Sequence, residues 1–453
     1  MKSKAKTSSK ILTAVLIVLS VALSAVLVAG AFMHIMNNES GVPGFAPDSD
    51  KTIDESNPVN TDEADIQENA GETVPNDESV ILSPVSPSAQ AVYSEEPTVE
   101  FHEKKVSFIC AGDNLIHTDV YGSAERFASG TDAEYDFKPM YSDIKEFISS
   151  YDFAFLNQEV PIAGKDRGFS GYPCFNSPDE LGDAVVDTGF NLINIATNHM
   201  LDKRNSGLIS SINYWREKPV AVIGDYLSEE EFNEIEILEK DGIKIAILAY
   251  TYGTNGIPLQ NNGDGLVVPY IDEEDIKEKV ARAKDISDLV FVSIHWGDEN
   301  QPFANATQKR LARMMADIGV DVIIGHHSHS IHPTEWLDRP DGGKTLVTYS
   351  LGNLLSGMQS PINVIGGMLS FDVVFYDDGL MPEITNVKII PTVCHFYGVP
   401  RDYHVYLFTD YTRALAEKHR LAGQLTYDKM KKIVTDTVDE QFLTEEFLAA
   451  DGR

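Results

Sequence analysis

Short apolar runs alternate with amphipathic segments along most of the chain after residue 104. Apolar runs of four to eight residues with polar or glycine-rich borders are typical of buried strands. We predict strands at 106–111, 153–156, 191–196, 220–223, 234–238, 243–250, 289–294, 320–324, 345–349 and 368–375. Asp241-Gly242, between two of these runs, indicates a β-hairpin turn.

Between the strands, apolar positions recur three or four residues apart, which is the helical period. We predict helices at 143–150, 179–187, 206–216, 273–284 and 307–318. Strands that alternate with helices indicate an α/β core, here with some antiparallel pairing. From about residue 401 the pattern becomes helical and charged, so 401–453 is predicted as a C-terminal helical tail.

The N-terminus carries one long apolar run, Ile11–Met33, which follows four lysines. As a helix, these residues extend about 35 Å, enough to cross a bilayer. We predict a basic cytoplasmic tail at 1–10 and a transmembrane signal anchor at 11–33, with the rest of the chain outside the cytoplasm, at the cell membrane. A cleaved signal peptide is the alternative, because Ala29-Gly30-Ala31 resembles a cleavage site.

Residues 34–103 are rich in Pro, Ser, Asn, Glu and Asp and poor in aromatic residues. From Glu39 to Glu100 there are 15 acidic residues against one basic residue. Such a segment cannot bury enough apolar surface to offset its ordering entropy. We predict a disordered acidic linker that serves as a spacer.

The formal net charge of the chain is −34. A surface this acidic repels phosphate backbones, so nucleic acid is excluded as a partner. It would also repel a polyanionic polymer unless bound cations bridged the two. The chain has three cysteines, too few for a disulfide scaffold.

Five predicted strands each end in a short cluster of residues that bind metals in proteins. The clusters are Gly112-Asp113-Asn114, Asn157-Gln158-Glu159, Thr197-Asn198-His199, His295-Trp296-Gly297 and Gly325-His326-His327-Ser328-His329. In α/β sheets, sites gather where loops leave the carboxyl ends of strands. Carboxylates mixed with imidazoles and an amide suit Mn, Fe or Zn better than Ca.

The order of these clusters, together with Leu201-Asp202 and Tyr349-Ser350-Leu351-Gly352-Asn353, resembles the calcineurin-like metallophosphoesterases. It is more similar to the CapA-like poly-γ-glutamate capsule synthesis proteins, over about residues 105–400. The resemblance implies an α/β fold of four layers at 104–400, an αββα sandwich of two packed sheets with helices outside. It also implies a divalent metal centre, with two ions drawn from Mn, Fe or Zn.

Residue roles follow from the same resemblance. Asp113 would bind one metal and Glu159 would bridge both. Asn198 and His295 would bind the second metal, and His327 and His329 would complete the pair. His199 would act as general acid, oriented by Asp202.

Several of these residues keep a structural alternative. Asp202 would then cap the helix near Ser206, and Ser350 and Asn353 would only shape a turn. Trp296 is interpreted as packing or as a substrate platform. His117 is a candidate ligand only if its loop bends, because Leu115 stands where the superfamily has the histidine of Asp-x-His.

Two functions remain open. In the first, the protein is a metal-dependent hydrolase of the phosphoesterase type that acts in capsule synthesis or export; in the second, it is a non-catalytic, metal-containing scaffold that binds polymer. His199 favours the enzyme, since a binding site does not need it, and Leu115 favours the scaffold. The resemblance implies as partners an anionic cell-surface polymer or its precursor, the membrane subunits of a capsule synthase, and the membrane itself.

Overall fold

The computed structural model describes residues 103–453, except 262, 264 and 377–380. The predicted cytoplasmic tail, the transmembrane anchor and all but the last residue of the acidic linker lie outside the described residues. Among the helices that the structure describes, none combines the length and the apolar character needed to cross a membrane.

The first of two sheets has eight strands. Its strands run in the order β14 (Asp402–Leu407), β13 (Glu383–Tyr397), β12 (Ile365–Tyr376), β1 (Glu103–Leu115), β2 (Phe153–Asn157), β3 (Leu192–Asn194) and β4 (Ala221–Ile223), with β11 (Asn353–Ser356) beside β1. The pairs from β1 to β4 are parallel, as is the pair of β1 with β11. The pairs from β12 to β14, and β12 with β1, are antiparallel.

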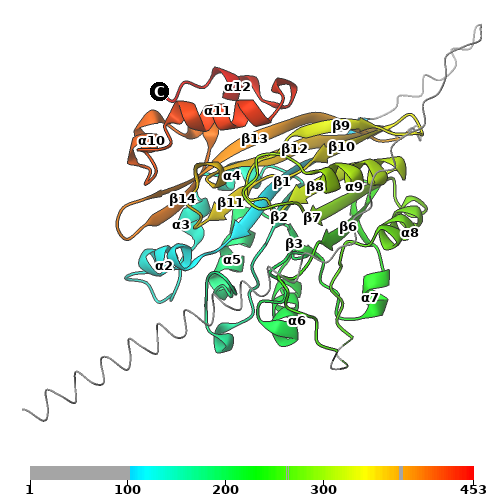
Figure 1. Cartoon of the computed structure of the whole chain (residues 1–453), viewed down its shortest axis with the longest axis horizontal. Coiled ribbons are helices and arrows are strands. Elements are labelled where there is room, and N and C mark those ends of the chain that lie inside the picture. Colours follow the sequence, from blue (N-terminus) through cyan, green and yellow to red (C-terminus); the bar gives the residue numbers. More distant parts are fainter. Residues whose placement is uncertain (1–102, 262, 264, 377–380) are drawn as a thin grey trace, which may run out of the picture. The chain divides into compact units, whose positions relative to one another are not determined.

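The second sheet has six strands and a parallel centre (Figure 1). Its order is β5 (Glu236–Lys240), β6 (Ile243–Thr251), β7 (Leu289–His295), β8 (Val322–His326), β10 (Lys344–Thr348) and β9 (Thr334–Asp338). Only the two edge strands, β5 and β9, run antiparallel to their neighbours. The predicted hairpin joins β5 to β6, and both Asp241 and Gly242 have positive φ, at 54° and 95°, as a type I′ turn requires.

Aromatic side chains join the two sheets. The ring of Phe108 on β1 lies 5.5 Å from that of Phe291 on β7, and Phe291 lies 5.7 Å from Phe371 on β12. Buried residues of both sheets form one continuous apolar cluster around these rings. The sheets therefore pack face to face and share a core.

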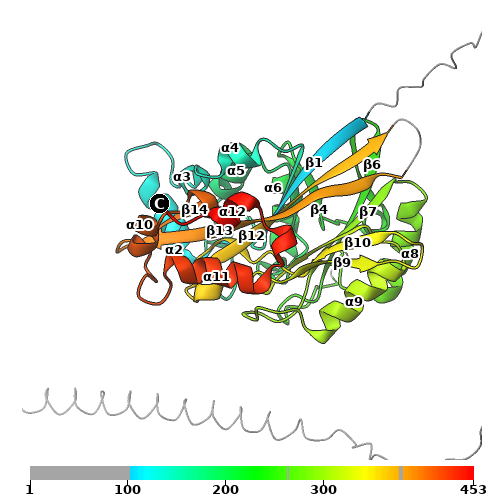
Figure 2. The same ribbon diagram turned by 90° about the horizontal axis from the view of Figure 1, so that it is seen from above.

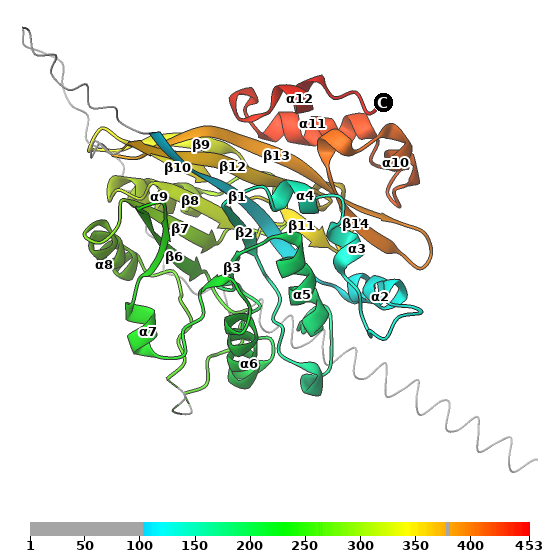
Figure 3. The same ribbon diagram turned by 180° about the vertical axis from the view of Figure 1, so that it is seen from behind.

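Helices cover the faces that the sheets turn away from each other. On the second sheet, α8 (Glu273–Lys284) and α9 (Ala306–Asp317) pack against a separate apolar cluster that includes Val290 and Val292. The other helices are α2 (Thr118–Phe127), α3 (Lys138–Tyr141), α4 (Lys145–Ile148), α5 (Asp179–Thr188), α6 (Arg204–Arg216), α7 (Glu229–Asn233), α10 (Arg413–Lys418), α11 (Tyr427–Thr437) and α12 (Glu445–Ala449). Figures 2 and 3 show α11 and α12 over β12 and β13. The expected mixed α/β sandwich of two sheets is confirmed for the described residues.

The chain differs from the predicted pattern at its C-terminal end. We expected helix from residue 401, but β14 occupies Asp402–Leu407 and pairs with β13. Helices follow only from Arg413. The burial of β14 alternates between buried and half-buried positions, so it is a strand with one covered face.

Candidate metal centre

Strand register brings the predicted clusters together. In the first sheet, Asp113 on β1 pairs with Asn157 on β2, and Asn157 pairs with Asn194 on β3. In the second sheet, His295 at the end of β7 pairs with His326 at the end of β8. Because these strands are parallel, their carboxyl ends lie at one edge of each sheet, and the loops that follow face a common space.

Asp113, Glu159 and His329 form one buried group of possible metal ligands. Nδ1 of His329 lies 3.0 Å from Oδ2 of Asp113 and 3.6 Å from Oε2 of Glu159. The other oxygen of Asp113 accepts a hydrogen bond of 2.7 Å from the side-chain amide of Asn157. Asn157 in turn accepts one of 2.6 Å from Asn194. The paired asparagines therefore fix the direction of the Asp113 carboxylate.

Glu159, His295 and His327 form a second buried group. Nε2 of His295 lies 3.7 Å from Oε1 of Glu159 and 3.0 Å from Oδ1 of Asn198. The rings of His295 and His327 are 4.8 Å apart between centroids. Glu159 is the residue common to both groups, with one oxygen toward each.

The surroundings of the Glu159 carboxylate indicate whether this site suits a cation. Glu159 is 1% exposed, and neither of its oxygens has a hydrogen-bond partner in the described structure. Nδ1 of His327 is also buried without a partner. A buried carboxylate without a partner is strongly unfavourable, and buried charges in proteins are paired or coordinate metals. The orphaned oxygens and the mixed set of carboxylate, amide and imidazole donors therefore fit a divalent metal.

Backbone strain occurs at the two histidines of the loop after β8. His327 has φ of 89° and His329 has φ of 56°, both in the left-handed region. Such conformations cost about 1–3 kcal/mol each and cluster at functional sites. The strained loop aims both imidazoles into the space shared with Glu159.

The histidines of the site differ in the direction in which their pKa values are shifted. Burial lowers the pKa of His327 to about 3 and holds that of His295 well below its ordinary value. Burial also opposes protonation of His329, but the charges of Glu159 and Asp113 outweigh it and raise its pKa to about 9. At neutral pH, His295 and His327 are therefore neutral, as metal ligands must be.

The two carboxyl groups respond differently to the same surroundings. Burial raises the pKa of Glu159 well above its ordinary value. Burial acts in the same direction on Asp113, but the hydrogen bond and the charge of His329 outweigh it and leave the pKa of Asp113 lowered. A bound cation would remove the cost of ionising Glu159.

His199 and Asp202 form a hydrogen-bonded pair beside the two groups. Nδ1 of His199 lies 2.8 Å from Oδ2 of Asp202, and Nε2 of His199 lies 4.0 Å from Oε1 of Glu159. The same oxygen of Asp202 accepts a hydrogen bond from the backbone N–H of Phe175, at 2.7 Å. Helix α6 begins at Arg204 with Lys203 as N-cap and no side-chain cap bond. Asp202 therefore contacts His199 and does not cap helix α6.

The remaining candidates of the sequence lie outside the metal groups. His117 accepts a hydrogen bond of 3.2 Å from the backbone N–H of Gly357 and packs edge-on against Phe175. Trp296 is buried, donates a hydrogen bond to the carbonyl of Tyr349 and stacks on its ring, so it is a packing residue. Ser350 accepts a hydrogen bond from the backbone N–H of Gly352 and shapes the turn.

Asn353 does more than shape a turn. Its Oδ1 lies 3.2 Å from Nδ1 of His329, and its amide donates to the carbonyls of His329 and Asn363. Asn353 also pairs with Asp113 across β11 and β1. It therefore positions two of the three members of the first metal group, Asp113 and His329, a role that the turn interpretation does not cover.

Other residues at the site carried no signal in the sequence. Asn255 accepts hydrogen bonds from the side chains of Asn198 and Tyr252, at 3.2 Å and 3.3 Å. The ring of Tyr252 is 4.5 Å from that of His327, and its side chain is 45% exposed. Glu299 forms a third possible metal group with His327 and His329. These residues are in loops, where periodicity gives no information.

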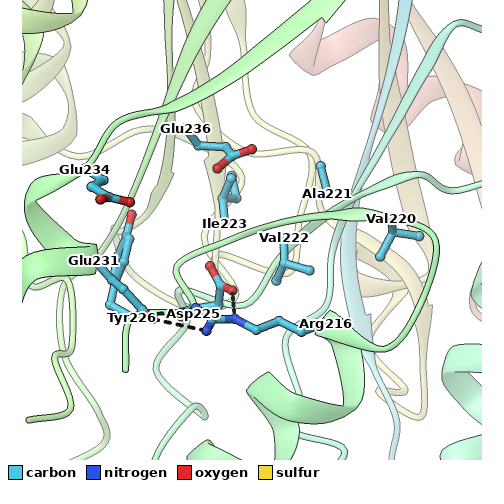
Figure 4. Close-up of a pocket in the computed structure, with 10 residues that line it drawn as sticks. All are labelled: Arg216, Val220, Ala221, Val222, Ile223, Asp225, Tyr226, Glu231, Glu234 and Glu236. Carbon is cyan, nitrogen blue, oxygen red and sulfur yellow. Dashed lines mark hydrogen bonds and ion pairs between the residues drawn. The ribbon is translucent and has the colours of Figure 1, made fainter. Parts of the chain in front are cut away.

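A separate pocket of about 390 Å³ lies along the edge strand β4 (Figure 4). Arg216 points into it and makes ion pairs with Asp225 and Glu231, at 2.7 Å and 2.9 Å. Glu234 and Glu236 also line this pocket. None of the predicted site residues belongs to it, so it is distinct from the metal groups.

A family model described as "Bacterial capsule synthesis protein PGA_cap" matches residues 107–358. The PGA biosynthesis protein CapA of Bacillus subtilis (strain 168) is 32% identical over 173 residues, which are 38% of this chain and 44% of that protein. The capsule biosynthesis protein CapA of Bacillus anthracis is 25% identical over 271 residues, 57% of this chain and 62% of that protein. The chain thus spans about half the length of these relatives.

Among solved structures, the NAD nucleotidase NadN of Haemophilus influenzae covers 76% of this chain and 66% of its own, at 12% identity and a TM-score of 0.40. A putative 5'-nucleotidase from Staphylococcus aureus, solved with alpha-ketoglutarate, covers 64% of this chain and 54% of its own, at 12% identity and a TM-score of 0.39. At these scores the similarity says nothing about the chemistry of the site.

Proposed function

The chain belongs to the bacterial capsule synthesis protein family PGA_cap, and on this premise we propose that it acts in the synthesis or export of an anionic capsule polymer. The polymer is poly-γ-glutamate or a related chain. In this proposal the two metal groups form a hydrolytic site of the phosphoesterase type that depends on divalent metal ions.

The main support for this proposal is the position of Glu159 between the two groups. Its two oxygens lack hydrogen-bond partners, and each faces a different set of ligands. Asp113 and His329 would hold one ion with Glu159, and Asn198, His295 and His327 would hold the other. Mn, Fe and Zn suit these donors, and such ions would supply Lewis-acid polarisation of a phosphoryl or acyl oxygen.

His199 supplies the proton in the proposed reaction. Its Nδ1 is engaged with the carboxylate of Asp202 at 2.8 Å, so a proton on Nδ1 is held there. Its Nε2 faces Glu159 and the shared space, from which it can protonate a leaving oxygen. Asp202 orients the ring through this contact. A site that only binds polymer has no use for this pair.

The proposal places the protein at the cell membrane, with Ile11–Met33 as its anchor and the domain outside the cytoplasm. The apolar run and the four lysines before it support this orientation. Its partners would be the capsule polymer or its precursor and the membrane subunits of a capsule synthase. Because the chain is strongly acidic, bound cations would also lower its repulsion of a polyanion.

A second candidate function rests on Leu115. This residue stands where the wider superfamily has a metal-binding histidine, so the first metal group has one ligand fewer. The protein would then be a non-catalytic scaffold that binds polymer through a retained metal. The two proposals differ in turnover and agree in metal binding.

The test uses the full-length chain, purified in mild detergent. Bound metal is measured per chain, and hydrolysis of phosphomonoesters and phosphodiesters is assayed with added Mn²⁺. We expect His199→Ala to abolish hydrolysis while the chain still binds metal. The control is His404→Ala, which removes an imidazole remote from the metal groups and should leave hydrolysis unchanged. Metal binding without turnover in the wild type would support the scaffold, and absence of bound metal would contradict both functions.

A further inference from the structure

Glu299 is a carboxylate at the site that neither the sequence pattern nor the strand ends indicate. It lies in the loop between β7 and α9, and its side chain can share a ligand sphere with His327 and His329. All three ligand atoms lie within 4.8 Å of one another. Glu299 is exposed, whereas both histidines are buried, so it approaches them from the solvent side.

The loop that carries Glu299 is fixed to the histidine loop. The backbone N–H of Asn300 donates a hydrogen bond of 2.8 Å to the carbonyl of Ser328. The carbonyl of Gln301 accepts a hydrogen bond from the hydroxyl of Ser330 and lies 2.7 Å from Nε2 of His332. At its far end, Asn305 forms a capping box with α9. The backbone of Glu299 is therefore held beside His327 and His329, although its side chain is exposed.

The carboxylate of Glu299 makes no salt bridge with any Lys or Arg that the structure describes. An exposed carboxylate that only improves solubility would not need a fixed loop or a position beside two strained histidines.

The first metal group, which shares His329 with the group of Glu299, has fewer donors than a divalent ion takes. Asp113, Glu159 and His329 provide three donors, and Leu115 provides none. Mn, Fe and Zn bound by oxygen and nitrogen take at least four ligands. A further carboxylate oxygen is a suitable donor for each of these metals.

We propose that Glu299 is an additional ligand of the metal centre and binds a divalent cation together with His327 and His329. This inference rests on the proposed function, because it requires that the centre binds metal. It assigns a direct role to a residue outside the five strand-end clusters. It also places a negatively charged ligand at the solvent side of the site, where cations enter.

The test is a titration of the metal-free full-length chain with Mn²⁺ by isothermal calorimetry. Glu299→Gln keeps the size of the side chain and removes the charged donor, so we expect its Mn²⁺ affinity to fall at least tenfold. Asp298→Asn removes the same charge from the neighbouring position of the same loop and should change the affinity less than threefold. Both variants should melt, without metal, at the wild-type temperature.

Co²⁺ provides a second readout, because its visible absorption depends on the number of ligands. We expect the spectrum of the Co²⁺ form to change in Glu299→Gln and not in Asp298→Asn. If Glu299→Gln keeps the wild-type affinity for Mn²⁺, or if both variants lose the same affinity, the inference is wrong and the proposed function stands. A wild-type chain that binds no Mn²⁺ would overturn the proposed function together with it.

Discussion

A single carboxylate, that of Glu159, links the two halves of the metal centre. Its two oxygens have no hydrogen-bond partner among the described residues, and the residue is only 1% exposed. Neighbouring imidazoles at 3.6–4.0 Å are too distant for good hydrogen bonds. A buried carboxylate without a partner lowers the stability of the fold, and a cation bound at this position would offset that cost.

Replacing Glu159 by Gln should remove most of the stabilisation that metal gives. A ligand at a hundred times its Kd stabilises a protein by about 2.7 kcal/mol, and Glu159→Gln takes the shared donor from both groups. The measurement is urea unfolding with saturating Mn²⁺ and with EDTA. Glu239→Gln, at an exposed position on β5, is the control and should keep the full gain. A full gain in Glu159→Gln would mean that metal binds elsewhere.

Replacing Asp202 by Asn tests the proposed positioning of His199. Asn can still accept the hydrogen bond from the N–H of Phe175, but it places no carboxylate beside the imidazole of His199. We expect kcat for phosphoester hydrolysis to fall about 10–100-fold, as for other partners that orient a catalytic histidine. KM and bound metal should stay the same. A change confined to KM would show that Asp202 acts on substrate binding instead.

At the scale of elements, the site depends on how closely β1 and β11 approach. The two strands pair in parallel, with Asp113 opposite Asn353, and the N–H of Asp113 donates to the carbonyl of Gly352 at 2.8 Å. A Cβ on Gly112 would lie 2.0 Å from that carbonyl oxygen. Only glycine fits here, so the Gly-Asp pair of the sequence is a packing requirement as well as a ligand signal.

Gly112→Ala should therefore damage stability and metal binding together. Forcing an extra methyl group against backbone costs about 1–3 kcal/mol, and relief of the clash would move Asp113 away from His329. Thermal melting and Mn²⁺ titration measure the two effects. Gly423→Ala serves as control, because its Cβ meets nothing within 4 Å. Normal Mn²⁺ affinity in Gly112→Ala would separate Asp113 from the centre.

The sequence predicts those parts of the fold that have a local pattern. Helix α8 has the predicted bounds, because its apolar positions recur with the helical period; the structure adds Asp272 as its N-cap. The ligands at the strand ends were found together because a parallel sheet aligns carboxyl ends. The assigned roles of these ligands remain predictions.

Other features have no local signal. Strand β11 is only four residues long, with two polar and two apolar residues, and its pairing with β1 defines it. The contacts of Asn353 with His329, and those of Glu299, join residues far apart in the chain. Strand β14 has alternating burial, but its polar residues and the helices after it concealed it. The secondary structure of such segments depends on which strands they pair with in the fold. This pairing cannot be read from a single sequence.

At the scale of the whole molecule, a second group of histidines lies far from the metal groups in sequence, in the C-terminal region. The ring of His395 on β13 contacts Tyr411, with Nδ1 and the hydroxyl 2.7 Å apart, and lies 5.1 Å from the ring of His419. Burial, then the charges of His419, His404 and Lys418, lowers the pKa of His395 to about 3. Burial lowers that of His419 to about 4.

These histidines make stability depend on pH. The unfolded chain takes up a proton on each near pH 6.5, whereas the folded chain does so only near pH 3–4. The stability that these two histidines contribute is therefore complete above pH 6.5 and is lost as the pH drops toward 4. From pH 7 to pH 5, His395 alone should account for a loss of about 2 kcal/mol. Urea unfolding in EDTA should show this loss reduced in His395→Gln, and an identical loss would contradict the assignment.

The central claim is that loops from separate strands of two sheets build one metal centre. Anomalous diffraction at the Mn edge, from crystals of the protein grown with Mn²⁺, tests it most directly. We predict two peaks about 3.5–4 Å apart, one beside Asp113, Glu159 and His329 and the other beside Glu159, Asn198, His295 and His327. Peaks only at the acidic pocket of Asp225 and Glu231, or no peak at Glu159, would contradict the account.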